Sequence, residues 1–409
     1  MSILISIISI IVVAIFVYFF ILQRLQPSIP PIISTISPTI SPTLIPPTPT
    51  LIPPTPIPIS PTPIPIQPTK IPPTKIPPTT QLEKQLYNIY NTVENRLTWI
   101  QSNVHTVSTG TCVPNIPFPP TNININSFYK NTPCKCEQDP VLYATYQTAM
   151  TPITSYKNAI INTSNNYLFN QIDVACFQTI MNLPVQNKSF LGTMQTTQST
   201  LEKMFFSITF MIVYTTNYKI LQSLNIESYI ASLVKGYETY SSNTNNLKSW
   251  YILAKTYSTL ISNGNLSDID ALYTSQCNQI NNNGTIDSEL ARGIKSSSYH
   301  AYFMLPLIIV TFILYKCSGS TSYNQPKLHL LLNYILACYF TPISGQVAME
   351  DISPWFTLYT VVFGTKYIDA THLSLAKQLV QNVKITNTST IGNIVYTFVA
   401  ANSNFSLSI

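Results

Sequence analysis

Residues 283–307 read NGTIDSELARGIKSSSYHAYFMLPL, and this stretch decides how the chain folds. A polar turn leads into a short charged segment, and an apolar run then continues from residue 302 to residue 315. A helix that is apolar on nearly every side lies inside a large protein or in a membrane. This run is short for a membrane span and contains Pro306. We therefore predict a buried helix of a large helical domain rather than a second membrane span.

Three residues of this stretch have a spacing with chemical meaning. Glu289 and Arg292 are three residues apart and can pair on a helix. Tyr299 follows Arg292 by seven residues, close to two turns, so we expect both on one face of a continuous helix. A guanidinium beside a tyrosine favours the phenolate, which can exchange a proton with a substrate. The alternatives are a structural ion pair for Arg292 and an ordinary interface position for Tyr299.

The stretch resembles the signature of the alginate lyases, a family of α/α-toroid polysaccharide lyases. That family has an Asp/Asn-Gly turn, a Glu-x-x-Arg, a Tyr-His seven residues after the Arg, and then a Leu-x-Pro-Leu-like run. The positions in register here are Gly284, Glu289, Arg292, Tyr299, His300, Pro306 and Leu307. The resemblance implies a mostly α fold, in which paired helices form an incomplete toroid around a groove for an extended polysaccharide.

Other segments resemble the same family over roughly residues 110–365. The family has Asn-Asn-His with a Trp three residues later, and this chain has Asn245, Asn246 and Trp250 with Leu247 in the His position. Tyr129 ends a Ser-Phe-Tyr that is similar to a Ser-Lys-Tyr near the active-site lid of the family. Weaker matches lie at residues 174–176 and 351–359.

The resemblance implies β-elimination on a uronic acid. Such enzymes remove the C5 proton and expel the 4-linked oxygen, with positioned donors that neutralise the carboxylate and a Tyr as acid, base or both. No metal or organic cofactor is expected. The implied catalytic residues are Tyr299, Arg292 and Asn246, and the implied substrate-binding residues are Trp250, His300, Glu289 and Tyr129.

Leu247 is the main departure from the family pattern, because leucine can neither neutralise a carboxylate nor accept a proton. Loss of one such donor typically costs on the order of a hundred- to a thousand-fold in rate. Catalytic activity is therefore left open, and the alternatives are a domain that only binds glycan and a structural virion membrane protein. From the residues alone, Asn246 can equally be a helix N-cap and Trp250 a core residue.

The N-terminus predicts a membrane anchor. Residues 3–22 form an apolar run of 20, enough to cross a hydrocarbon core of about 30 Å. A cleavable signal peptide, the alternative, would need a basic start and a small-residue cleavage site. Arg24 alone would place the C-terminal side in the cytoplasm. The cysteines and the lyase resemblance instead favour an extracellular, lumenal or virion-surface location.

Residues 25–80 are predicted to be a stalk between the anchor, residues 1–24, and a helical domain over 81–409. The tract is dense in Pro, Thr, Ser and Ile, which prevents helices and sheet ladders and favours extended polyproline II. A ligand for SH3-type domains is the alternative. The anchor-plus-stalk plan is similar to that of the envelope chondroitin lyase of baculovirus occlusion-derived virions, which belongs to a different lyase family. This similarity favours a viral envelope protein used in entry.

The amino-acid composition limits the kinds of partner that the protein is expected to bind. Only 9% of residues are charged, and the net charge of +6 is spread without a basic run, so nucleic acid is not an expected partner. An acidic polysaccharide, alginate or a glycosaminoglycan, and a membrane are the expected partners. The first four of the seven cysteines predict one or two disulfides, and their spacing does not fit a zinc site. These four are Cys112, Cys134, Cys136 and Cys176.

Apolar residues at helical spacing predict a helix over 81–106 and further helices beyond residue 140. The later ranges are 141–163, 167–182, 195–222, 226–241, 244–263, 286–316, 326–341, 354–364 and 370–384. Residues 107–140 are predicted to be irregular, and 385–409 to be a strand or tail.

Overall fold

The computed structural model describes residues 80–90, 116–132, 137–168, 173–317 and 325–381. All of them belong to the second of the two units into which the chain divides, Thr74–Ile409. The predicted anchor, the stalk, the C-terminal tail and three of the seven cysteines lie outside the described residues.

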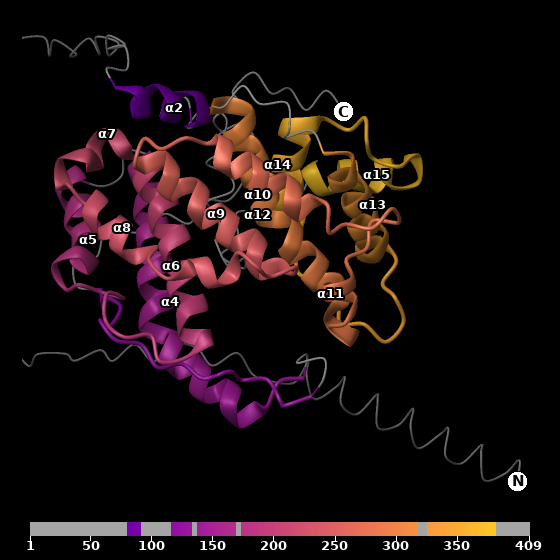
Figure 1. Ribbon diagram of the computed structural model, residues 1–409, viewed down its shortest axis with the longest axis horizontal. Helices are drawn as coiled ribbons and strands as arrows, with labels where there is room; N and C mark the ends of the chain where they lie inside the picture. Colours follow the sequence, from indigo (N-terminus) through magenta and orange to yellow (C-terminus); the bar gives the residue numbers. More distant parts are fainter. Residues whose placement is uncertain (1–79, 91–115, 133–136, 169–172, 318–324, 382–409) are drawn as a thin grey trace, which may run out of the picture. The chain divides into compact units, whose positions relative to one another are not determined.

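The described residues form helices joined by short turns, with two isolated β-bridges (Figure 1). The longer helices are α2 (Gln81–Tyr90), α4 (Pro140–Leu168), α5 (Val174–Gln186), α6 (Thr197–Thr216), α9 (Asn246–Ile261), α10 (Ser267–Cys277), α12 (Ser296–Cys317), α13 (Pro326–Phe340), α14 (Ser353–Phe363) and α15 (Ala370–Gln381). The shorter ones are α7 (Tyr218–Leu221), η1 (Gln222–Leu224), α8 (Glu227–Leu233), η2 (Tyr237–Tyr240), α11 (Asp287–Leu290) and η3 (Gly293–Lys295).

The helices form pairs that are arranged in two layers. Helices α4, α6, α9, α12 and α14 contact one another in that order, so they form one continuous row. Each also contacts a helix that follows it in the chain: α5, α8, α10, α13 and α15 respectively. Figure 1 shows α9 between α6 and α12. Paired helices in two layers are the arrangement of an α/α toroid, so the predicted mostly α fold is confirmed.

Helix α12 is the centre of the core. All of residues 303–314 are buried, and α12 packs against α9, α13 and α14. By length and composition alone, the stretch 293–317 could cross a membrane, and it is the one such helix among the described residues. However, 72% of its apolar window is buried by the surrounding helices. The prediction of a buried core helix is therefore confirmed.

Three details differ from the sequence-based prediction. The range 226–241 is not one helix, because the chain is divided into α8 and η2 at Gly236, which has a φ of 94°. Helix α10 was not predicted, because most of its sequence SDIDALYTSQC is polar, although Ile269, Tyr273 and Cys277 are buried and lie four residues apart. The predicted continuous helix over 286–316 is also wrong. The chain leaves α11 after Leu290, and Gly293 has a φ of 57°, a left-handed conformation that glycine adopts at low cost. A new helix then begins at Ser296.

The turn before α11 holds this region against α13. Gly284 has a φ of 81°, and a Cβ atom there would lie 2.3 Å from the carbonyl oxygen of Leu330. Only glycine fits, both because of the left-handed backbone and because of the close approach.

We expect Gly284→Ala to lower the free energy of unfolding by roughly 2–4 kcal/mol, from backbone strain plus a clash with backbone atoms. Gly236→Ala is the matched control, since Gly236 also has a positive φ, 94°, but open space around it. It should cost only about 1 kcal/mol. Urea denaturation of both variants measures the difference, and equal losses would show that the contact with α13 contributes nothing.

Candidate active site

Two tyrosines from distant parts of the chain meet at the candidate site. The hydroxyl oxygens of Tyr129 and Tyr299 are 3.0 Å apart and hydrogen-bonded, across 170 positions of sequence. Tyr299 lies in the first turn of α12, and Tyr129 lies in the irregular segment that precedes α4. Burial raises the pKa of Tyr129, and the neighbouring Tyr299 raises it further. Tyr129 therefore keeps its proton at neutral pH and can donate it to the oxygen of Tyr299.

Two cations flank this tyrosine pair. The guanidinium carbon of Arg292 lies 4.8 Å from the centre of the Tyr299 ring, and Lys295 Nζ lies 5.3 Å from the centre of the Tyr129 ring. Partial burial lowers the pKa of Lys295. Lys295 was missed by the sequence analysis. Its position three residues after Arg292, on the same break between helices, is the signal that could have identified it.

A buried carboxylate holds Arg292 in place. Glu289 Oε2 lies 3.7 Å from Arg292 Nε, so the predicted pair forms. Glu289 Oε1 accepts hydrogen bonds from the backbone N–H and the side-chain amide of Asn246, at 2.6 and 3.1 Å. Burial raises the pKa of Glu289, and the donors from Asn246 oppose that rise. Its side chain is fully buried, so in this structure Glu289 positions Arg292 and Asn246.

The start of α9 brings Asn246 to this carboxylate. The N-cap is Asn245, whose side-chain oxygen accepts the N–H of Leu247 at 3.0 Å, and Asn246 is the first helical residue. The alternative of an N-cap role for Asn246 is therefore excluded. Leu247 is partly buried and packs against the hydrophobic core.

His300 has a structural role. Its Nε2 accepts the N–H of Ile286 at 2.9 Å, and its Nδ1 lies 2.8 Å from the carbonyl oxygen of Ser296. The side chain is fully buried and both ring nitrogens have polar partners, so neither nitrogen is available to a ligand. In this structure the imidazole ties the turn before α11 to the start of α12.

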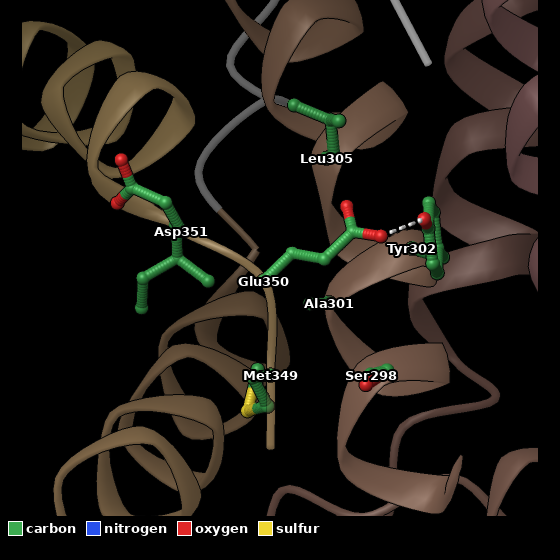
Figure 2. A pocket seen from close by; sticks show the side chains of 8 residues that line it. Ser298, Ala301, Tyr302, Leu305, Met349, Glu350 and Asp351 are labelled. Carbon is green, nitrogen blue, oxygen red and sulfur yellow. Dashed lines mark hydrogen bonds between the residues drawn. The ribbon is translucent and has the colours of Figure 1, made fainter. Parts of the chain in front are cut away.

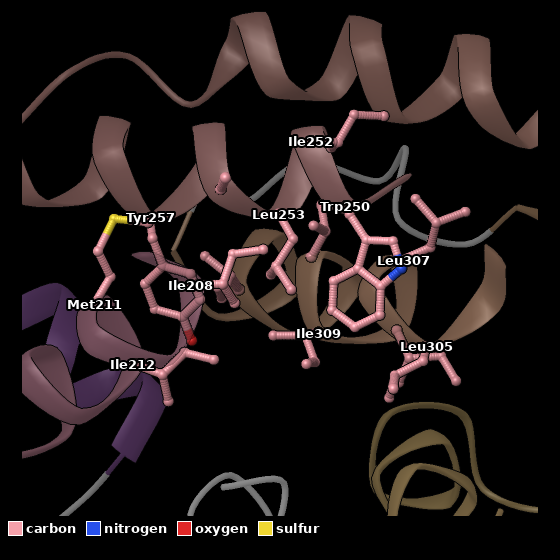
Figure 3. Close-up of a cluster of buried hydrophobic side chains, with 14 of the residues drawn as sticks. Ile208, Met211, Ile212, Trp250, Ile252, Leu253, Tyr257, Leu305, Leu307 and Ile309 are labelled. Carbon is pink, nitrogen blue, oxygen red and sulfur yellow. The ribbon is translucent and has the colours of Figure 1, made fainter. Parts of the chain in front are cut away.

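Trp250 is also part of the core. It is 1% exposed and meets the Phe205 ring edge-on at 5.1 Å, and Figure 3 shows it beside Leu307 of α12. The structure therefore favours the alternative that Trp250 is a core residue, because a helix position that faces α12 is covered by that helix.

Aromatic side chains extend the site beyond Tyr129. The Phe128 ring lies 4.4 Å from that of Tyr129 and 4.4 Å from that of Tyr146. The hydroxyl of Tyr146 donates to Glu202 at 2.8 Å. This cluster fixes the irregular segment against α4 and α6, and so fixes the position of Tyr129 over α12.

On the other side of the site is a small pocket between α12 and the segment before α14 (Figure 2). Tyr302, whose ring centre lies 6.1 Å from that of Tyr299, donates its hydroxyl to Glu350 at 3.2 Å.

Among the described residues, no group of three or more His, Cys, Asp or Glu side chains could hold a metal ion. Cys176 is disulfide-bonded, whereas Cys277, Cys317 and Cys338 are free.

Comparison with known proteins agrees with this fold. Residues 144–342 match the family model described as alginate lyase. Two solved structures of alginate lyase A1-III, each complexed with a tetrasaccharide, share the fold at 14% sequence identity. A Tyr-to-Phe variant gives a TM-score of 0.53 over 63% of this chain and 79% of that chain. A His-to-Ala variant gives 0.57 over 68% and 88%. No individual curated protein matches the chain.

The domain has the helical fold of these two alginate lyase structures. Its resemblance to the alginate lyase family is confirmed over residues 144–342. The matched range contains the Arg292–Tyr299 segment and the start of α9, but not Tyr129.

The buried histidine makes stability depend on pH. Burial lowers the pKa of His300 to about 4 from an ordinary 6.5, so its contribution is complete above pH 6.5 and is lost as the pH falls through about 4. We expect up to about 3 kcal/mol of unfolding free energy to disappear over this range. His329, with a pKa also lowered to about 4 by burial, adds a similar share.

Urea denaturation at pH 7, 5.5 and 4.5 measures this loss. His300→Gln should be less stable at pH 7 and show a flatter pH dependence, and His329→Gln should remove only its own share. If the free energy of unfolding of His300→Gln depended on pH as steeply as that of the parent protein, His300 would already be charged in the native protein.

Proposed function

We propose that this protein is a membrane-anchored polysaccharide lyase that cleaves a uronate-containing acidic polysaccharide by β-elimination. The observation that carries the proposal is the hydroxyl pair of Tyr299 and Tyr129 flanked by Arg292 and Lys295. The four groups combine a proton-transfer residue, a proton donor and two positive charges.

The reaction breaks the C5–H and C4–O bonds of the uronate and forms a C4–C5 double bond. Tyr299, as phenolate, takes the C5 proton, and the departing 4-linked oxygen is protonated by a tyrosine hydroxyl. Negative charge builds on the substrate carboxylate as the C5 proton leaves, and the cations beside the tyrosine pair stabilise it. Tyr129, which keeps its proton at neutral pH, stabilises the phenolate of Tyr299 by donating a hydrogen bond.

Lys295 answers the main objection to an active enzyme. The family's histidine is replaced by Leu247, so one carboxylate-neutralising group is missing from the start of α9. Lys295, the last residue of η3, brings a second cation to the tyrosine pair. Asn246, whose amide already donates to Glu289, contributes chiefly by fixing the carboxylate that holds Arg292.

The partner is proposed to be an acidic polysaccharide, alginate or a glycosaminoglycan. The tetrasaccharide complexes of alginate lyase A1-III support an oligosaccharide ligand for this fold. We further propose that residues 3–22 anchor the protein, with residues 25–80 as a stalk and the lyase domain outside the cell, in a lumen or on a virion surface. An envelope protein that thins a host matrix during entry fits this plan.

A glycan-binding protein without catalytic activity is the second candidate, and Leu247 is the observation that favours it. Leu247→His separates the two. A gain of orders of magnitude in turnover would identify a lyase that has lost much of its activity. An unchanged, absent turnover would favour a groove that serves binding.

Tyr299→Phe should abolish elimination, because the phenyl ring can neither accept nor return the proton. The full-length protein in detergent is incubated with polymannuronate, polyguluronate, hyaluronan, chondroitin and heparosan, and ultraviolet absorbance follows the unsaturated uronate product. Product from any polymer that persists in Tyr299→Phe would remove this residue from the mechanism. A flat trace in the folded parent protein would reject the lyase proposal.

Lys295→Met should lower kcat/KM by roughly a hundred- to a thousand-fold, the cost of losing one preorganised charge-stabilising group. Lys235→Met is the matched control, since Lys235 is an exposed lysine between α8 and η2 and should leave kcat/KM unchanged. Equal activity of the two variants would show that Lys295 does not act on the substrate.

A further inference from the structure

We propose that the polymer alternates uronate with N-acetylhexosamine, as in the glycosaminoglycans, rather than carrying a uronate at every position. The inference rests on the proposed lyase function and adds the identity of the neighbouring sugar. It comes from the pocket beside Tyr302, which the proposed elimination step does not use (Figure 2).

The pocket is next to the tyrosine pair. Tyr302 is one helical turn beyond Tyr299 on α12, and their ring centres are 6.1 Å apart. The other wall is the segment that leads into α14, and Gln346 holds this segment to the start of α12 by accepting hydrogen bonds from Ser297. A sugar bound next to the reacting uronate on this side would reach the pocket.

The pocket has an apolar lining and two carboxylates, those of Glu350 and Asp351. Its apolar wall consists of Ala301, Leu305, Met349 and Ile352. Asp351 is exposed, and its Oδ1 accepts the N–H of Ser353 at the start of α14. Glu350 is exposed, and its Oε1 accepts the hydroxyl of Tyr302 while Oε2 has no hydrogen-bond partner among the described residues.

The site therefore has charges of opposite sign on its two sides. Arg292 and Lys295 flank the tyrosine pair and suit the carboxylate of the uronate that reacts. Glu350 lies on the far side of Tyr302, where it would repel a second carboxylate and accept a hydrogen bond from a neutral donor. A homopolymer of uronate places a carboxylate on both sides, whereas an alternating polymer places one only at the cations.

An acetamido group matches both the apolar wall of the pocket and the carboxylate of Glu350. Its methyl group is apolar and can be buried against the aliphatic wall formed by Leu305 and Ile352. Its N–H is a neutral donor for the carboxylate of Glu350, a charge-assisted hydrogen bond. A uronate offers neither the methyl group nor the N–H.

The test compares kcat/KM of the full-length protein in detergent on hyaluronan, chondroitin and heparosan with that on polymannuronate and polyguluronate. We expect at least a tenfold preference for one or more of the alternating polymers. Glu350→Lys should reverse the order by lowering alternating-polymer cleavage and raising homopolymer cleavage, each about tenfold. Asp268→Asn, an exposed carboxylate in the first turn of α10, is the control that should leave the ratio unchanged.

Calorimetric titration of Tyr299→Phe with tetrasaccharides of each polymer separates the two proposals. Tighter binding of the alternating tetrasaccharides without turnover in the parent protein would reject the lyase function and support the inference. A preference for homopolymers, a ratio unchanged by Glu350→Lys, or binding of no tetrasaccharide would overturn the inference.

Discussion

The buried carboxylate of Glu289 is the interaction on which the site depends. It receives two hydrogen bonds from Asn246 at the start of α9 and faces Arg292 at the break before α12. Removing one partner of a buried ion pair leaves an uncompensated charge, which typically costs about 3–5 kcal/mol. The fold therefore cannot release Arg292 without a large penalty, and the position of the guanidinium over Tyr299 is a consequence of how α9 and α12 are joined.

The break at Gly293 explains why two cations reach the same pair of tyrosines. On a straight helix, Arg292 and Lys295 would lie on the same face, one turn apart, with both side chains tilted toward the N-terminal end of the helix. The left-handed residue between them changes the direction of the chain, so that Arg292 lies over Tyr299 and Lys295 lies over Tyr129. Glycine is needed at this position for the same reason as at Gly284, because an L side chain rarely adopts that backbone conformation.

Local patterns predicted a good part of this structure. The apolar run after Tyr299 predicted a buried helix, and the spacing of Glu289 and Arg292 predicted their pair. The contact of Tyr129 with Tyr299 joins segments 170 residues apart, so no local pattern could show it, and only the family resemblance placed Tyr129 near the site. Lys295 was missed because residues 286–316 were predicted to be one continuous helix, without the break that brings Lys295 to Tyr129.

The residues that were assigned to the site by family resemblance alone differ in how deeply their side chains are buried. Trp250 and His300 match the family positions, yet both are enclosed, one in the core and one between two turns. A matched residue type shows that the local fold is kept, because the same packing needs the same side chain. It does not show contact with a ligand. Chemistry in this domain therefore has to be argued from side chains that remain partly accessible and lie beside one another, which here are Tyr129, Arg292, Lys295, Tyr299 and Tyr302.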